Sequence, residues 1–457
     1  MKFADCIVAG GGFPGIYAAW RIAKSGKNVC LVEASDSLGG VMKSREWNGY
    51  WLDNGTQNLD LRSDNAREFY TDILGEDLRF LENHDWASTI DTTPTLGFEM
   101  PDFSVDDTIT ARRALNEITK LENKAPVGTP DDARSFLDWY ESNYGPSLTS
   151  AIRAMLEKVT GGHTDAIGVH GRSTLSMLLR PKLANDDMMV KLKSSSAFFN
   201  DRMGVTRHCG DDQFTGSMAS EQFAYPSYGG LGQFCKRAEQ RLQELGVDIQ
   251  HHSYIEKIER KDDGLSVQTS HQEISASTLL WTLPDHLLSK ILNIHDNSLK
   301  ESLPVGYCIY AFEVKGDVIL GPDYLHDYSN TRLPFRYSRP GIFSGQSPRE
   351  NHTIVMAEVP SHPGDQESLM QPAIVEKVWE DCISAGYVKP ETLYTDACYW
   401  GVPVAFTLPT SSWKEAYDHV KQEREKAHQN IVCIEPNSRG RAAFIRHFDN
   451  QLGALVR

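Results

Sequence analysis

The chain has 457 residues, a formal net charge of −16 at pH 7, and 40% hydrophobic and 24% charged residues. This composition is typical of a globular protein with a large core, and at about 150 residues per domain the length allows two or three domains. An acidic chain lacks the basic surface that nonspecific nucleic-acid binding needs, and it lacks a polybasic membrane anchor. We therefore expect no nucleic-acid partner, while a local basic pocket for an anionic substrate stays open.

Hydropathy and cysteine spacing indicate the compartment. No apolar run approaches the roughly 20 residues that a membrane-spanning helix needs, and the short apolar start at 3–9 lacks a signal-peptide cleavage site. The cysteines form no C-x-x-C pair and do not combine with histidine at the spacing of zinc ligands. We therefore expect a cytoplasmic protein with reduced thiols, no membrane span and no metal site.

The start of the chain predicts a β-α-β unit. A buried strand is expected at 3–9, and a G-x-G-x-x-G pattern follows it at 10–15. A helix is expected over 16–23 and a second buried strand over 28–33. Such a unit is the opening of a parallel sheet covered by helices.

The glycine pattern is typical of a loop that binds a dinucleotide. Gly10 allows a tight turn, Gly12 lets the backbone approach a pyrophosphate, and Gly15 lets the helix pack close to the strand. The helix N-terminus offers N–H groups and a positive dipole to phosphates. Glu33 ends the second strand, where its carboxylate can accept hydrogen bonds from a ribose diol. The alternative is a glycine-rich turn beside a surface glutamate.

The rest of the chain alternates between helical and strand-rich regions. Residues 61–216 are expected to be mainly helical and to end in a polar loop over about 184–216. The α/β pattern returns over 225–288, and 305–400 is expected to be rich in strands. The elements expected are helices at 66–74, 111–121, 133–140, 148–159, 233–245 and 411–428, strands at 248–252, 265–269, 277–283, 306–313, 353–359 and 431–434, and a closing helix over 450–456 with Asp449 as its N-cap.

Further motifs accompany the β-α-β unit in a fixed order. They are Leu38-Gly39-Gly40, Asp53-Asn54-Gly55-Thr56, the turn at 225–232, the strand end Trp281-Thr282-Leu283-Pro284, and Gly440-Arg441 followed by Phe448-Asp449. In this order they resemble the flavin-containing amine oxidase and protoporphyrinogen oxidase-like superfamily. One departure is that the arginine common after the Gly-Gly turn is replaced by Val41-Met42-Lys43.

The resemblance implies FAD as the cofactor. In the superfamily the Gly-Gly turn contacts the pyrophosphate, the Asp-x-Gly element brings backbone next to the flavin ring, and a backbone segment after the second helix pairs with adenine. The N-terminus of the final helix points at the flavin. Carried over to this sequence, the implied FAD-binding residues are Gly10, Gly12, Phe13, Pro14, Gly15, Glu33, Ala34, Gly39, Gly40, Val41, Asn54, Gly55, Thr56, Tyr254, Ile255, Thr282, Arg441 and Asp449.

The substrate-side candidates are Arg336 and Tyr399. The segment Phe335-Arg336-Tyr337-Ser338-Arg339-Pro340 is similar to a strand of UDP-galactopyranose mutase-like and protoporphyrinogen oxidase-like members, where an arginine lies near flavin and substrate. An arginine fork suits a carboxylate or diphosphate; the alternative is a surface arginine at a strand edge. Tyr399 and Trp400 are candidates for an aromatic wall beside the flavin, with core packing as the alternative.

The expected fold class is α/β. A Rossmann-like FAD-binding domain of the glutathione reductase-like type is expected over 1–60, 217–290 and 425–457. An interleaved α+β substrate domain is expected to combine a helical part, 61–216, with a sheet part, 291–424. The flavin is expected at the interface of the two domains, where pockets commonly form.

The expected function is that of an FAD-dependent oxidoreductase. A C–N or C–C bond of a small substrate would be oxidised by hydride transfer to flavin N5, and oxygen or another acceptor would regenerate the cofactor. The substrate could be anionic. The sequence has no second G-x-G-x-x-G, which disfavours a dedicated NAD(P)H domain. Alternatives are a redox-neutral, mutase-like reaction of a nucleotide sugar with reduced FAD, and a flavin-binding subunit without turnover.

Overall fold

The computed structural model describes residues 2–55, 58–81, 84–122, 135–206, 223–261, 264–345, 347–427, 429–434, 440–448, 450 and 453–456. The chain divides into two compact units, and each unit is assembled from separate stretches of sequence. Unit 1 comprises Met1–Phe80, Gln222–Lys300 and Lys414–Arg457, and unit 2 comprises Leu81–Glu221 and Glu301–Trp413.

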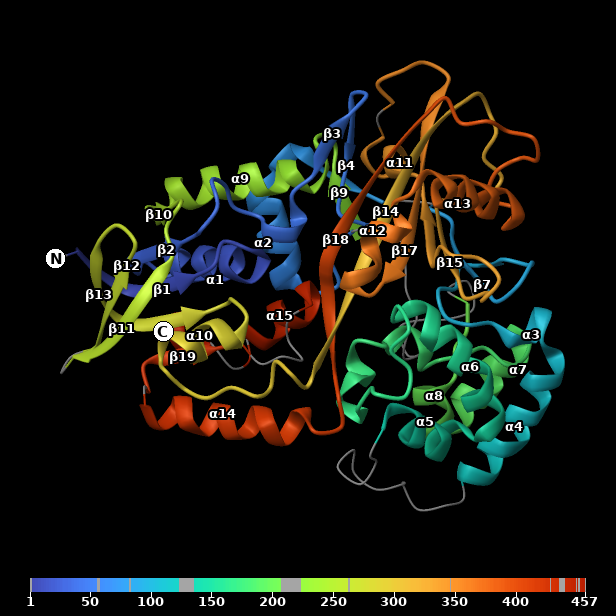
Figure 1. Cartoon of the computed structure of the whole chain (residues 1–457), viewed down its shortest axis with the longest axis horizontal. Helices are drawn as coiled ribbons and strands as arrows, with labels where there is room; N and C mark the ends of the chain where they lie inside the picture. The colour runs from blue at the N-terminus through green and yellow to red at the C-terminus, as the bar shows by residue number, and fades with distance from the viewer. Residues whose placement is uncertain are drawn as a thin grey trace. The chain divides into compact units, whose positions relative to one another are not determined.

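Unit 1 is built on a sheet with the strand order β10-β2-β1-β13-β12-β11, and β19 also pairs with β13 (Figure 1). The pairs β10–β2, β2–β1, β1–β13 and β13–β19 are parallel, whereas β12 and β11 are added antiparallel. The bounds are β1 Lys2–Ala9, β2 Val29–Val32, β10 Asp248–Gln250, β11 Ile255–Lys261, β12 Gly264–Thr269, β13 Glu273–Trp281 and β19 Ile431–Cys433. Every residue of β2 is buried, as expected for a parallel strand covered on both faces.

Helices group around α1 in unit 1 (Figure 1). They are α1 Phe13–Lys24, α2 Asp64–Leu74, α9 Gly230–Glu244 and α15 Arg441–His447. Their contact is aromatic: the Phe69 ring of α2 lies 5.0 Å from Tyr17 and 4.9 Å from Trp20 of α1. Aromatic rings of this size dominate the burial energy of a core.

Unit 1 continues past residue 60, where the sequence predicted the helical region to begin. The reason is that α2 packs against α9, and that β6 pairs with β9. The remaining elements are β3 Arg45–Trp47, β4 Tyr50–Leu52, β5 Leu59–Asp60, β6 Leu78–Phe80, β9 Phe223–Pro226, α10 Asp285–Ile291 and α14 Trp413–Ala427, whose first residue belongs to unit 2.

Unit 2 contains a sheet with the order β18-β14-β17-β16-β15-β7-β8. One face is apolar and is covered by α13, whose Trp379 ring lies 5.1 Å from Phe312 of β14. The bounds are β7 Trp86–Thr89, β8 Thr95–Leu96, β14 Ser302–Lys315, β15 Tyr324–Asp327, β16 Arg336–Ser338, β17 His352–Ser361, β18 Asp396–Pro409, α11 Pro340–Ser344, α12 Gln366–Leu369 and α13 Pro372–Ser384.

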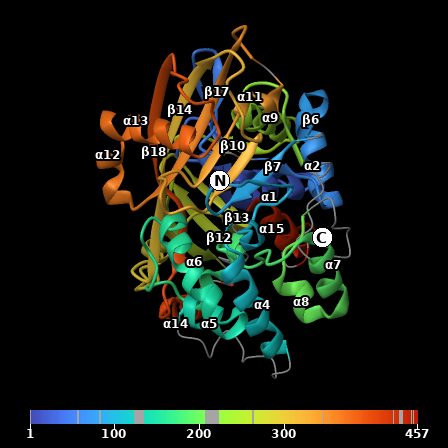
Figure 2. The same ribbon diagram turned by 90° about the vertical axis from the view of Figure 1, so that its right-hand side faces the viewer.

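A helical layer completes unit 2, in which α4, α5 and α6 pack side by side (Figure 2). The bounds are α3 Phe103–Asp106, α4 Thr108–Glu122, α5 Phe136–Tyr144, α6 Pro146–Val159, α7 Asp186–Ser195 and α8 Ala197–Arg202. The apolar side chains of these helices, such as Ile118, Tyr140 and Ile152, are fully buried in one cluster. No helix in the described part of the chain is long and apolar enough to cross a membrane.

The predicted β-α-β unit, the α/β class and most predicted helices and strands are confirmed within a few residues. The strand expected at 248–252 ends at Gln250, since His252 has a positive φ of 51°. The helix expected at 133–140 begins at Phe136 with Ser135 as its N-cap, and 133–134 lie outside the described residues.

One expectation about secondary structure is wrong, and another is tested only in part. The polar loop expected at 184–216 contains α7 and α8 in its described part, 184–206, while 207–216 lie outside the described residues. Asn185 and Ser196 cap these helices, and the buried Lys193 ammonium donates to backbone carbonyls. The closing helix expected over 450–456 lies partly outside the described residues, as do its expected N-cap Asp449 and residues 451–452. Within it, Gly453–Val456 forms a short 3-10 turn, and a separate helix, α15, lies upstream from Arg441. The strand-rich region also holds α13, whose start at Pro372 is a typical first-turn proline.

Replacing Asn185 with Ala should lower the free energy of unfolding of unit 2 by about 1 kcal/mol, because the Asn185 side chain accepts a hydrogen bond from the Met188 N–H. Chemical denaturation followed by circular dichroism measures the change. Ser194→Ala, an exposed position within α7, is the control. Equal stability of both variants would show that the cap contributes nothing.

Candidate functional site

The loop between β1 and α1 has the geometry that its glycines predict. Gly10 has a φ of 101°, and a Cβ on Gly15 would lie 1.8 Å from the Gly10 carbonyl oxygen. Within the described part of the chain, a Cβ on Gly12 would meet no atom closer than 3.9 Å, and no side chain caps α1. Gly15 is therefore needed for packing, whereas no side chain among the described residues packs closely against the backbone at Gly12 or caps the N-terminus of α1.

Glu33 lies at the end of β2, where its carboxylate is held in place. Its Oε2 accepts a hydrogen bond from the Gly11 N–H at 2.7 Å, and its Oε1 accepts from the Ser35 N–H at 2.8 Å and the Ser35 hydroxyl at 2.6 Å. Burial acts to raise the pKa of Glu33, but the hydrogen bonds and the Lys43 ammonium bring it below the ordinary value. The result is an ionised acceptor beside the glycine loop.

The Gly-Gly turn comes to the same place. The Gly39 N–H donates to the Gly11 carbonyl at 2.8 Å, and a Cβ on Gly40 would lie 3.5 Å from the Gly12 Cα. Both turn glycines have positive φ, 119° and 55°. The structure thus brings two glycine turns into backbone contact, with the Val41 side chain 60% exposed next to them. Phe13 and Pro14 open α1 beside this contact, and Ala34 is exposed after Glu33.

The Asp-x-Gly element joins the Gly-Gly turn through Asn54. The Asn54 amide donates to the carbonyls of Val41 at 3.2 Å and Lys43 at 3.3 Å. Gly55 follows with a φ of 91°, while Thr56 lies outside the described residues. The Arg441 guanidinium donates to the Asn58 carbonyl at 2.8 Å, so the start of α15 reaches this loop.

The remaining predicted cofactor residues lie at the ends of two strands of the unit 1 sheet, Thr282 after β13, and Tyr254 and Ile255 at the start of β11. Thr282 Oγ1 donates to the Ala9 carbonyl at 2.7 Å and thereby fixes the turn that starts at Gly10. The Tyr254 N–H and carbonyl already make hydrogen bonds to Ser270, so at Tyr254 the 57% exposed ring is what faces solvent. Ile255 begins β11 and is buried.

In unit 2, Arg336 lies on the sheet face opposite α13. Its guanidinium forms an ion pair with Glu358, the residue directly opposite on β17, and Glu358 is completely buried. It also donates to the Tyr324 hydroxyl at 3.4 Å and lies 5.3 Å from the centre of the Tyr307 ring. Because Glu358 balances the charge of Arg336, the pair presents little net positive charge.

A directed chain of hydrogen bonds continues from Arg336. Arginine can only donate, so the Tyr324 oxygen accepts from it and the Tyr324 O–H donates to His326 Nε2 at 2.7 Å. His326 Nδ1 then carries the proton and donates to the Glu99 carbonyl at 2.9 Å. Burial and the nearby Arg336 lower the pKa of His326 to about 3, which is consistent with a neutral ring. The sequence analysis missed Tyr324 and His326, although their i, i+2 spacing is typical of one strand face.

Tyr399 and Trp400 do not form one wall. They are successive residues of β18, so their side chains point to opposite faces of the sheet. Trp400 is paired with Ile309, and Ile309 is paired with Glu358, the residue opposite Arg336. The Trp400 side chain therefore lies on the same face of the sheet as Arg336. Tyr399 lies 6.2 Å from Tyr310 on the α13 side and is 41% exposed.

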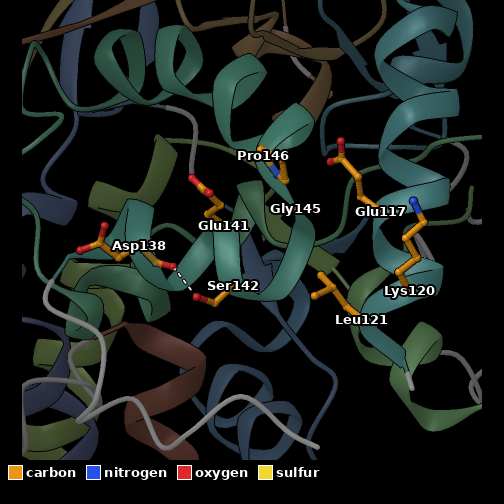
Figure 3. A pocket seen from close by; sticks show the side chains of 8 residues that line it. All are labelled: Glu117, Lys120, Leu121, Asp138, Glu141, Ser142, Gly145 and Pro146. Carbon is orange, nitrogen blue, oxygen red and sulfur yellow. Dashed lines mark hydrogen bonds between the residues drawn. The ribbon is translucent and has the colours of Figure 1, made fainter. Parts of the chain in front are cut away.

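A cavity of about 510 Å³ lies in the helical layer of unit 2. In Figure 3, Glu117 and Lys120 reach it from α4, and Asp138, Glu141 and Ser142 reach it from α5. Glu117 is already held by the Ser147 N–H at 2.9 Å and the Ser147 hydroxyl at 2.6 Å. The lining of the cavity includes no residue that the sequence predicted for FAD or substrate, so the candidate site is assigned to the glycine loops instead.

Comparisons with known proteins agree with this geometry. Residues 8–73 match the family model of an NAD(P)-binding Rossmann-like domain. The chain is similar in structure to a proposed protoporphyrinogen oxidase from Exiguobacterium sp. 255-15, with a TM-score of 0.68, 15% identity, and coverage of 100% of this chain and 98% of that chain. It is equally similar to a reduced UDP-galactopyranose mutase, with a TM-score of 0.68, 15% identity, and coverage of 97% and 91%.

The chain has the fold of the amine oxidase and protoporphyrinogen oxidase-like flavoproteins. A cyclohexylamine oxidase from Brevibacterium oxydans IH-35A shares this flavoprotein fold, with a TM-score of 0.65, 12% identity, and coverage of 99% of this chain and 98% of that chain. The predicted resemblance and fold class are therefore confirmed at the level of the fold.

A curated relative matches over a shorter segment. An L-amino acid dehydrogenase of Synechocystis sp. (strain ATCC 27184 / PCC 6803 / Kazusa) is 26% identical over 157 residues, which are 30% of this chain and 33% of that protein. The match thus spans about a third of the length of the dehydrogenase.

Replacing Arg336 with Met should destabilise unit 2 by about 3–5 kcal/mol, because Glu358 would be left buried without its counter-charge. The double variant Arg336→Met/Glu358→Met should recover most of this loss, since an apolar pair of similar size needs no desolvation. Urea denaturation of the parent and the variants measures both effects. A single variant no less stable than the double variant would contradict the buried ion pair.

Proposed function

We propose that the chain is an FAD-dependent oxidoreductase that oxidises a C–N or C–C bond of a small molecule. The observation that carries the proposal is the position of the ionised Glu33 carboxylate between the Gly11 N–H and Ser35, beside an uncapped α1 N-terminus. The ionised acceptor suits the ribose of a dinucleotide, and the helix N-terminus suits its pyrophosphate. FAD is preferred over NAD because of the fold and the additional glycine turn.

The residues present fit the cofactor. The N–H groups at the start of α1 and the turn Gly39-Gly40 would hold the pyrophosphate, since the space beside Gly12 is open. Glu33 would hold the adenosine ribose, and Asn54, Gly55 and Arg441 would lie toward the flavin. When bound, FAD supplies an acceptor for a hydride at flavin N5.

We assign substrate binding to the face of unit 2 that carries Arg336. Its guanidinium Nη2 is engaged by Glu358, so an anionic substrate group would have to compete with a buried carboxylate. A substrate without net negative charge fits the pair better, and the ring of Tyr307 offers it an apolar contact. Tyr324 and His326 keep the guanidinium in one orientation. Tyr399 lies on the other face and is given no role in the reaction.

A second candidate is redox-neutral chemistry with reduced FAD. The observation that favours it is that the reduced UDP-galactopyranose mutase is as similar in structure as the proposed protoporphyrinogen oxidase. The experiment is an anaerobic screen of amines, amino acids, porphyrinogens and nucleotide sugars. Bleaching of the flavin by a substrate supports the oxidoreductase, whereas turnover only after reduction with dithionite supports the mutase. If no compound of the panel gives either result, both the oxidoreductase and the mutase are contradicted, and a subunit without turnover is favoured.

Replacing Glu33 with Ala should weaken FAD binding by about 1–3 kcal/mol, because hydrogen bonds to a charged acceptor are lost. Isothermal titration of the apoprotein with FAD measures the change. Asp36→Ala is a matched control, since it removes the same charge from a fully exposed carboxylate three residues along. Equal affinities of both variants would contradict the ribose assignment.

The affinity for FAD should also depend on pH in a defined direction. The pKa of Glu33 lies below its ordinary value of 4.5, so the carboxylate stays ionised at any pH above that value. We expect this contribution to binding to be constant above pH 4.5 and to be lost as the pH falls further through the pKa of Glu33. FAD retention after buffer exchange at decreasing pH measures it. In Glu33→Ala this component of the pH dependence should be absent.

A further inference from the structure

The N-terminus of α9 differs from that of α1, because side chains close it. The Leu231 N–H donates to Asp53 Oδ1 at 3.0 Å, and the Gly232 N–H donates to the Ser44 hydroxyl at 2.7 Å. Helix N-termini carry N–H groups that need acceptors. At α9 these N–H groups are bound by the protein itself, so this glycine turn is not the place for a phosphate.

The glycines of this turn make room for those side chains. A Cβ on Gly230, whose φ is 61°, would lie 2.5 Å from the Ser44 hydroxyl oxygen and 2.8 Å from Asp53 Oδ1. A Cβ on Gly232 would lie 3.2 Å from the Ser44 backbone nitrogen. The glycines that resemble a cofactor motif therefore allow Asp53 and Ser44 to approach the helix.

Asp53 connects several segments of unit 1. Its side chain is 96% buried, since only 4% of the residue is exposed. Besides Leu231, it accepts hydrogen bonds from the Ser44 hydroxyl and from the Tyr225 hydroxyl, each at 2.5 Å. Burial raises the pKa of Asp53, while these hydrogen bonds and the charge of Arg441 act in the opposite direction. One carboxylate thus joins the segment before β3, strand β9 and helix α9.

The residues that follow Asp53 belong to the proposed flavin half of the site. The Gly55 N–H donates to the Asp53 carbonyl at 2.9 Å, and the Asn54 amide holds the Val41 and Lys43 carbonyls. The hydrogen bond of Asp53 to Ser44 and the two hydrogen bonds of Asn54 therefore couple the loop 53–55 to the loop 41–44. Glu33 and the start of α1, which are proposed for the ribose and the pyrophosphate, make none of these hydrogen bonds with Asp53.

We propose that Asp53 is a positioning residue for the flavin half of the FAD site, fixing the loops 41–44 and 53–55 against the N-terminus of α9. The inference rests on the proposed function, because it needs FAD to be the cofactor. Asp53 itself touches no ligand in this scheme. It acts through Asn54, Gly55 and Val41, and it leaves the adenosine half to Glu33.

The test compares FAD with ADP, which carries the adenosine and the two phosphates of FAD but no flavin, on apoprotein of the parent and of Asp53→Asn. The variant keeps the shape of the side chain but loses its charge. We expect the dissociation constant of FAD to rise about tenfold or more, as for loss of hydrogen bonds to a charged group. That of ADP should stay within about twofold, and the visible circular dichroism of bound flavin should change, because its surroundings move. Ser44→Ala should give a smaller change of the same kind, and it replaces Asp53→Asn if that variant does not fold.

The matched control is Asp72→Asn. Asp72 is another carboxylate of unit 1 with hydrogen bonds, from the Trp20 indole at 2.7 Å and from Arg241 at 3.1 Å, but it is remote from the proposed flavin loops in sequence. This variant should lower thermal stability and leave the flavin circular dichroism unchanged. Equal losses of FAD and ADP affinity in Asp53→Asn, or an unchanged flavin spectrum, would overturn the inference while the proposed function stands. A parent protein that binds ADP but not FAD would overturn the proposed function and the inference together.

Discussion

The architecture of unit 1 depends on the close approach of two backbone segments. A Cβ on Gly15 would lie 1.8 Å from the Gly10 carbonyl oxygen, so α1 can lie this near β1 only with glycine at that position. This approach brings Tyr17 and Trp20 into the aromatic contact with Phe69, around which the other helices pack. In the same loop, the Gly11 N–H donates to Glu33 and the Gly11 carbonyl accepts from the Gly39 N–H of the second glycine turn. Fold and site thus share one steric requirement.

Much of unit 1 could be predicted from the sequence because its signals are local. A glycine pattern between an apolar strand and a helix, followed by an acid at the end of the next strand, fixes both the elements and their chemistry within the first 33 residues. Even the missed helices α7 and α8 have local signals: Asn185 and Ser196 are N-caps. They were overlooked because polar residues such as Lys193 are buried there, bound to backbone carbonyls rather than exposed.

The charged face of unit 2 could not be predicted in the same way. Strand pairing places Trp400, Ile309, Glu358, Arg336, His326 and Ser88 in one row across the sheet. These positions are far apart in the sequence, and a shift of one residue in any strand would send its side chain to the other face. Arg336 was found through a family resemblance, whereas its neighbours Tyr324 and His326 follow only from the register. For the same reason the sequence could not place Tyr399 and Trp400 on opposite faces without the bounds of β18.

The interleaving of the two units has a consequence for the order in which they can form during synthesis. Strand β19 enters the sheet of unit 1 beside β13, and its residues belong to the stretch that begins at Lys414. Unit 2 ends at Trp413, so all of its residues have left the ribosome before unit 1 can close. The β-α-β unit is synthesised before unit 2, but its sheet is completed only by β19, which is synthesised after unit 2. In the interval, the segment Leu279–Trp281 of β13 lacks its partner β19 and remains an open edge of the sheet.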